Sequence, residues 1–114
     1  MSGAVMDSPV YGAVADPTRR AILDLLRTGE KTVNALLAGF SMTQSALSQH
    51  LAVLRKAGLV TFRKAGRQRF YALSATPLRD VSDWLAHYQR FWDKNLERLG
   101  DYLEREHGRR KTRR

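Results

Sequence analysis

Apolar residues recur at intervals of three and four along most of the chain, which predicts a mainly helical protein. One helix begins at Asp16, a suitable N-cap, followed by Pro17 at the first helical position, and it ends at Gly29. A short amphipathic helix is predicted before it. Another short helix follows, with Thr32 as its cap and Gly39 at its end.

The next helix is predicted from a capping box formed by Ser41 and Gln44, and Gly58 ends it. About three residues separate it from the preceding helix, which is the spacing of a helix-turn-helix. Its apolar side chains share one face: Ala46, Leu47, Leu51 and Leu54.

Apolar and polar residues alternate over 59–64 and 67–73, which predicts two strands. Ala65 and Gly66 lie between them as a two-residue turn, in which glycine can adopt a positive φ. The expected order is therefore a helix followed by a β-hairpin.

A last, long helix is predicted from Thr76 as N-cap and Pro77 at the first helical position. Its apolar residues form a near-heptad stripe, which exceeds what one thin domain can cover, so we expect it to pack against a second copy. The predicted dimer residues are Leu78, Val81, Leu85, Tyr88, Trp92, Leu96 and Leu99.

The length of 114 residues is enough for one domain. We predict a single domain over 1–106, with a dimerisation helix over about 77–106 and a basic, disordered tail over 107–114. The sequence contains no cysteine, no apolar run long enough to span a membrane and no recognisable secretory signal. We therefore expect a cytoplasmic, nucleoid-associated protein that has no membrane partner.

Charge adds a class of partner to this picture. The chain carries 20 Lys and Arg against 11 Asp and Glu, a formal net charge of +9. No acidic residue occurs between Lys31 and Arg79, so the helix and hairpin lie in a segment that is free of acids and carries only positive charges. We call it the acid-free segment. Such a surface favours a polyanion, either nucleic acid or anionic lipid.

Catalytic motifs are missing from the sequence. It contains no glycine-rich phosphate loop, no Ser/His/Asp or Cys/His set and no clustered metal ligands. We therefore expect a protein that is not an enzyme and has no cofactor.

Four segments together resemble the ArsR/SmtB family of winged helix-turn-helix repressors: ADPTRRAILDLL, SALSQHLAVLRKAGLV, RKAGRQRFYAL and PLRDVSDWL. The resemblance covers roughly residues 10–105, and 45–60 is its specific part. It implies a mainly α fold with a small β-hairpin (α+β), dimeric through its N- and C-terminal helices. It also implies a homodimeric repressor that binds an inverted-repeat operator in double-stranded DNA.

The start of the helix that ends at Gly58 is the expected base-reading surface, because recognition helices enter the major groove by their N-terminal turns. Short polar residues are suited to base edges, and glutamine can pair with adenine. Gln44 either caps the helix alone or also reaches DNA. The base-reading candidates are Thr43, Gln44, Ser45, Ser48 and Gln49.

The basic hairpin is expected to track the minor groove or its phosphates, although a merely solvated hairpin is the alternative. Arg55 either contacts the backbone or complements the helix dipole. His50 contacts a phosphate or has a structural role. The backbone and wing candidates are His50, Arg55, Arg63, Lys64, Arg67, Gln68 and Arg69.

The resemblance also raises the question of an effector, because many members of this family respond to metals. Their Cys-x-Cys pair has no counterpart in TVNALLAGF, and the spacing of Asp83 and His87 on the last helix matches no family pattern. We expect no metal site. A small molecule, a partner protein or the protein's own concentration remain as signals, and a non-specific basic architectural protein remains as the alternative function.

Overall fold

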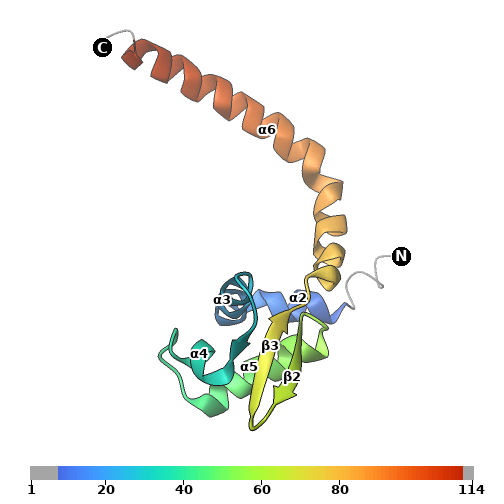
Figure 1. Ribbon diagram of the computed structural model, residues 1–114. Coiled ribbons are helices and arrows are strands. Elements are labelled where there is room, and N and C mark those ends of the chain that lie inside the picture. Colours follow the sequence, from blue (N-terminus) through green and yellow to red (C-terminus); the bar gives the residue numbers. More distant parts are fainter. Residues whose placement is uncertain (1–7, 112–114) are drawn as a thin grey trace. The chain divides into compact units, whose positions relative to one another are not determined.

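The computed structural model describes residues 8–111, with side chains for residues 8–105. The chain divides into a compact unit that ends at Val81 and a helical unit that begins at Ser82. The helices are α2 (Pro9–Ala15), α3 (Pro17–Leu26), α4 (Val33–Leu37), α5 (Gln44–Lys56) and α6 (Arg79–Lys111) (Figure 1). The strands are β1 (Lys31–Thr32), β2 (Val60–Ala65) and β3 (Gln68–Leu73).

Side-chain oxygens fix the starts of the first helices. Ser8 caps α2, while Asp16 Oδ2 accepts a hydrogen bond of 2.9 Å from the backbone N–H of Arg19 at the start of α3. This bond holds the pKa of Asp16 below its usual range. Thr32 caps α4 in the same way, through a 3.1 Å bond to the N–H of Ala35. The predicted starts at Asp16 and Thr32 are confirmed.

The predicted capping box at the start of α5 is wrong. Thr43 is the N-cap: its backbone is extended, and its hydroxyl accepts a 3.1 Å hydrogen bond from the N–H of Ala46. Gln44 is consequently the first helical residue, and Ser41 lies in the preceding turn. A capping box needs the glutamine two residues further into the helix, so Ser41 and Gln44 cannot form one.

The end of α5 is a sharp reversal at Gly58, as predicted. Gly58 has a φ of +79°, and its N–H donates to the carbonyl of Arg55 at 2.9 Å. The N–H of Leu59 donates to the carbonyl of Leu54, also at 2.9 Å, so the pair forms a Schellman motif. This turn delivers Leu59 and Val60 directly into the core.

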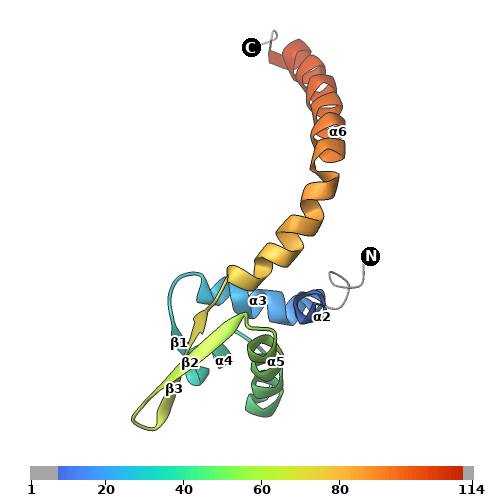
Figure 2. The ribbon, with the colours of Figure 1, turned by 90° about the vertical axis from the view of Figure 1, so that its right-hand side faces the viewer.

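The sheet has three antiparallel strands in the order β1-β3-β2. Ala65 pairs with Gln68, so the hairpin turn is Gly66-Arg67, one residue later than predicted. Gly66 has a φ of +64° at the first turn position, which is the conformation of a type II′ turn. Strand β1 was not predicted, because two residues are too short to show an alternating pattern. The turn end of the hairpin β2–β3 projects away from the helices (Figure 2), and the whole hairpin is called the wing below.

The predicted N-cap at Thr76 is also wrong. Thr76–Leu78 form a 3-10 turn that runs into α6, and no side chain caps it. The N–H of Leu78 instead donates to the carbonyl of Ala75 at 2.9 Å. Helix α6 includes residues 107–111 of the predicted tail, and 112–114 lie outside the described residues.

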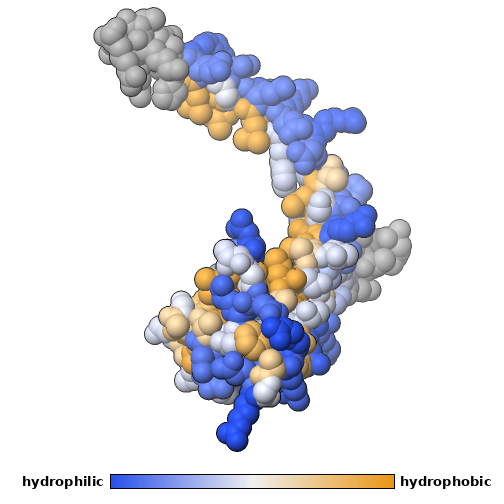
Figure 3. Space-filling model, in the orientation of Figure 1, coloured by the Kyte–Doolittle hydropathy of each residue, from blue (hydrophilic) through white to orange (hydrophobic). Residues whose placement is uncertain are grey.

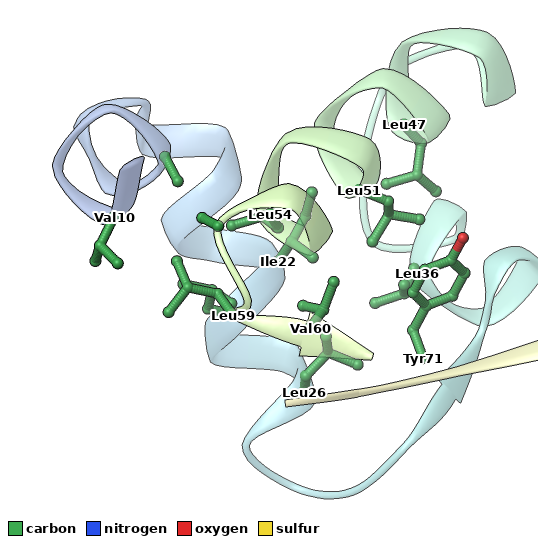
Figure 4. Packing of buried hydrophobic residues seen from close by; sticks show 13 residues of the cluster. Val10, Ile22, Leu26, Leu36, Leu47, Leu51, Leu54, Leu59, Val60 and Tyr71 are labelled. Atoms are coloured by element: carbon green, nitrogen blue, oxygen red, sulfur yellow. The ribbon is translucent and has the colours of Figure 1, made fainter. Parts of the chain in front are cut away.

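The core of the first unit gathers apolar side chains from every helix of that unit and from the wing (Figure 4). Leu47, Leu51 and Leu54 of α5 point into it and are almost wholly buried. Each such side chain contributes about 1.5–3 kcal/mol. This burial fixes which face of α5 turns inward, and it leaves the polar face in solvent.

Helix α6 carries large apolar side chains that are exposed in the single chain (Figure 3). Of the predicted dimer residues, Leu78 and Val81 pack against the core of their own chain. Tyr88, Leu96 and Leu99 are 45, 62 and 52% exposed. None of the described helices combines the length and the apolar character needed to cross a membrane.

Candidate nucleic-acid interface

The exposed face of α5 presents a row of uncharged polar side chains. Gln44, Ser45, Ser48 and Gln49 are all exposed, because the buried leucines of the same helix turn the opposite way. None of the four side chains has a hydrogen-bond partner among the residues that the structure describes, so their donors and acceptors are available. Thr43 differs from them, since its hydroxyl is already used as the cap of α5.

A hollow of about 300 Å³ lies between the start of α5 and the wing. Gln44 and Ser48 line it from the helix, and Arg67 and Arg69 line it from the wing. No Asp or Glu is among the described residues around it. We call this space the helix–wing hollow; its remaining lining residues are Thr32, Val33, Asn34, Gln68 and Tyr71.

Asn34 was not predicted as part of the site. It is exposed in the first turn of α4, and the fold brings it to the helix–wing hollow beside Gln44 and Ser48. Its side chain adds two N–H donors and a carbonyl acceptor to that surface. The sequence offers no signal for this placement, because an exposed asparagine near a helix start usually only faces solvent.

Phe62 links helix α5 to the wing. The guanidinium carbon of Arg55 lies 4.4 Å from the centre of the Phe62 ring, and that of Arg69 lies 4.7 Å from it. Tyr71 packs against the same ring at a centroid distance of 5.4 Å. Two predicted DNA-contacting arginines, one from each element, are therefore held on one aromatic side chain.

Arg63 is engaged differently from the other basic residues of the wing. Its guanidinium forms a two-pronged ion pair with Glu30 and lies 4.6 Å over the Phe70 ring. The hydrogen bonds from Arg63 hold the pKa of the Glu30 carboxyl below its usual range. Glu30 immediately precedes the acid-free segment, so the sequence pattern did not connect it with the wing.

The tip of the wing keeps its positive charge. Lys64, Arg67, Gln68 and Arg69 are exposed, and no carboxylate of the described residues pairs with the three cations. They therefore remain available to phosphates. His50 is half-buried on the side of α5, and its Nδ1 lies 3.3 Å from Nη1 of Arg19.

Asp83 and His87 lie one helical turn apart on α6, and both are exposed. Within the part of the chain that the structure describes, no group of three or more His, Cys, Asp and Glu residues is arranged to hold a metal ion. Two ligands alone do not make a structural metal site.

Known proteins share this architecture. The family model for bacterial regulatory proteins of the arsR family matches residues 16–61. The transcriptional repressor SdpR of Bacillus subtilis is 33% identical over 87 residues, which cover 76% of this chain and 97% of that protein. The transcriptional regulator Rv2034 of Mycobacterium tuberculosis is 38% identical over 84% of this chain and 87% of its own length.

The likeness extends to solved structures. An ArsR-like transcriptional regulator from Rhodococcus sp. RHA1 superposes with a TM-score of 0.69 at 26% identity, over 90% of this chain and 94% of that one. The match includes both the segment that contains α5 and the winged fold that presents it. The chain belongs to the ArsR/SmtB family of winged helix-turn-helix transcriptional regulators.

Proposed function

We propose that this protein is a homodimeric repressor that binds an inverted repeat in double-stranded DNA. The observation that carries the proposal is the helix–wing hollow. It joins the polar start of α5 to the cationic wing, and no carboxylate of the described residues lines it. A surface of this kind supplies hydrogen bonds to base edges beside charges for phosphates.

Helix α5 and the wing have different roles in the proposal. Gln44, Ser45, Ser48 and Gln49 form direct contacts in the major groove, where glutamine suits adenine and serine suits several base edges. Lys64, Arg67 and Arg69 contact phosphates or the minor groove and set the register of the helix. Thr43 has a supporting role, because its hydroxyl caps α5. Arg63 contributes less charge than its neighbours, since Glu30 balances it.

The dimer in this proposal forms through α6. Phe91, Leu96 and Leu99 are 65, 62 and 52% exposed in the single chain, and Trp92 lies on the same helix. An apolar stripe of this size marks a protein interface, and a second copy covers it by the same stripe. Two recognition helices related by a two-fold axis read half-sites about one helical turn apart.

Selection from a random duplex library tests the proposal. The expected result is enrichment of one inverted repeat, bound about 10³-fold or more tightly than random duplex at physiological salt. Equal affinity for every duplex in an anisotropy titration would instead indicate the non-specific architectural function. A reporter gene placed behind the selected repeat then distinguishes repression from activation, and repression is expected.

A further inference from the structure

One side chain outside the helix–wing hollow ties three helices together. The Nε of Arg19 donates to the carbonyl of Ala13 at 2.8 Å, and its Nη2 donates to the carbonyl of Gly12 at 3.1 Å. These carbonyls belong to the last turn of α2, where helical carbonyls lack partners within the helix. The remaining nitrogen, Nη1, lies 3.3 Å from Nδ1 of His50 on α5.

This contact favours one of the two neutral tautomers of His50. A guanidinium has only donors, so Nδ1 must be the acceptor and the hydrogen of the neutral ring must be on Nε2. The opposite neutral tautomer would place a hydrogen on the atom that receives the bond. Among the described residues, Arg19 is the only hydrogen-bond partner of the ring, so the Nε2–H remains available as a donor.

Hydrogen bonds hold the Arg19 guanidinium in the position from which it donates to His50. Its backbone N–H donates to Asp16, and two of its guanidinium nitrogens are fixed by the end of α2. The third nitrogen is therefore presented to α5 with little freedom. His50 is half-buried, so a ring fixed on one edge can still reach an anion with the other.

We infer that Arg19 is a positioning residue for DNA binding. By donating to Nδ1, it holds the His50 ring in one orientation and in the Nε2–H tautomer, and that N–H then donates to a DNA phosphate. The inference rests on the proposed DNA-binding function and extends it, since Arg19 acts through His50.

Arg20 provides a matched control on the same helix. Its Nη1 donates to the carbonyls of Val14 and Ala15 at the end of α2, at 2.7 and 3.3 Å. It therefore has the same charge and a similar anchoring role as Arg19. Among the described side chains it forms no hydrogen bond with His50, so replacing it tests charge and anchoring alone.

Nitrogen-15 NMR of the imidazole groups in the free protein tests the tautomer directly. The wild type is expected to show His50 protonated at Nε2 and bare at Nδ1. Arg19→Met should convert this signal to that of a tautomer mixture, whereas Arg20→Met should leave it unchanged. A wild-type His50 protonated at Nδ1, or an unchanged tautomer in Arg19→Met, would overturn the inference.

Anisotropy with a random-sequence duplex of about 30 base pairs tests the consequence for binding, because phosphate contacts form without sequence selectivity. Arg19→Met should weaken binding about three- to tenfold more than Arg20→Met does. His50→Gln offers an amide donor that needs no tautomer, so in that background the two arginine variants should weaken binding equally. Equal losses of duplex affinity in Arg19→Met and Arg20→Met, when His50 is present, would contradict the positioning role.

Two results keep this inference separate from the proposed function, and one variant makes it testable in any case. His50→Gln leaves the α2 anchor of Arg19 intact, so it can be measured even if Arg19→Met does not fold. A wild type without affinity for any duplex would refute the proposed function, while the NMR signal would still report on the Arg19–His50 bond. Normal duplex binding by a wild type that lacks the Nε2–H tautomer would refute the inference alone.

Discussion

Replacing Phe62 by leucine removes the aromatic ring on which the recognition helix and the wing meet. Leucine keeps most of the apolar volume but cannot hold Arg55 and Arg69, which lie 4.4 and 4.7 Å from the ring centre. Each cation–π contact at an exposed site is worth about 0.5–1 kcal/mol, and the pairing with Tyr71 adds about 0.5–1.5 kcal/mol. Phe62→Leu should therefore lower the free energy of unfolding by about 1.5–3.5 kcal/mol.

Urea denaturation of the purified protein measures this change. Phe70→Leu is the matched control, because Phe70 is similarly half-buried and holds a single guanidinium, that of Arg63, at 4.6 Å. It should lose less stability than Phe62→Leu does. The reasoning is refuted if Phe62→Leu costs no more than its control, since the shared ring would then not join helix and wing.

Three further predictions follow from single contacts. Glu30 has a lowered pKa in the folded chain, so its pairing with Arg63 stabilises the fold at pH values above the unfolded-state pKa. This stabilisation is lost as the pH falls through the folded-state pKa. Denaturation measured over a range of acid pH should show the loss in the wild type and not in Glu30→Gln. Thr43→Val should cost about 1 kcal/mol by denaturation while Ser41→Ala costs almost nothing, and equal costs would restore the capping box at Ser41. Leu99→Asp should shift the dimer to monomer by light scattering, and an intact dimer would exclude this part of α6 from the interface.

The helices were predictable because their signals are local. The oxygen of Asp16 and the ring of Pro17 lie side by side in sequence, and together they specify where α3 begins. At α5 the same logic failed, since Ser41 and Thr43 both offer a hydroxyl and only the backbone conformation decides between them.

The hairpin register shifted for a related reason. Gly66 can occupy either position of a two-residue turn, and the pairing of Phe62 with Tyr71 across the strands decides which. Periodicity along one strand contains no information about its partner.

The residues of the candidate site were likewise predictable only where the signal is local in sequence. The exposed polar face of α5 and the basic wing were evident from residue type and order. Glu30, Asn34 and Phe62 were missed, because each becomes part of the site only through segments distant in sequence. Arg19 reaches His50 across 31 positions, and no local sequence pattern connects the two residues.

The central claim is that one hollow combines base reading with phosphate binding, and a paired measurement of affinity tests it most directly. Anisotropy titrations of Gln44→Ala and Arg67→Ala would be made on the selected inverted repeat and on a scrambled duplex, over a range of salt concentrations. Gln44→Ala should cost about 1–3 kcal/mol on the repeat and little on the scrambled duplex. Arg67→Ala should weaken both duplexes alike and reduce the salt slope by about one. Uniform effects from both variants, or none from either, would contradict the account.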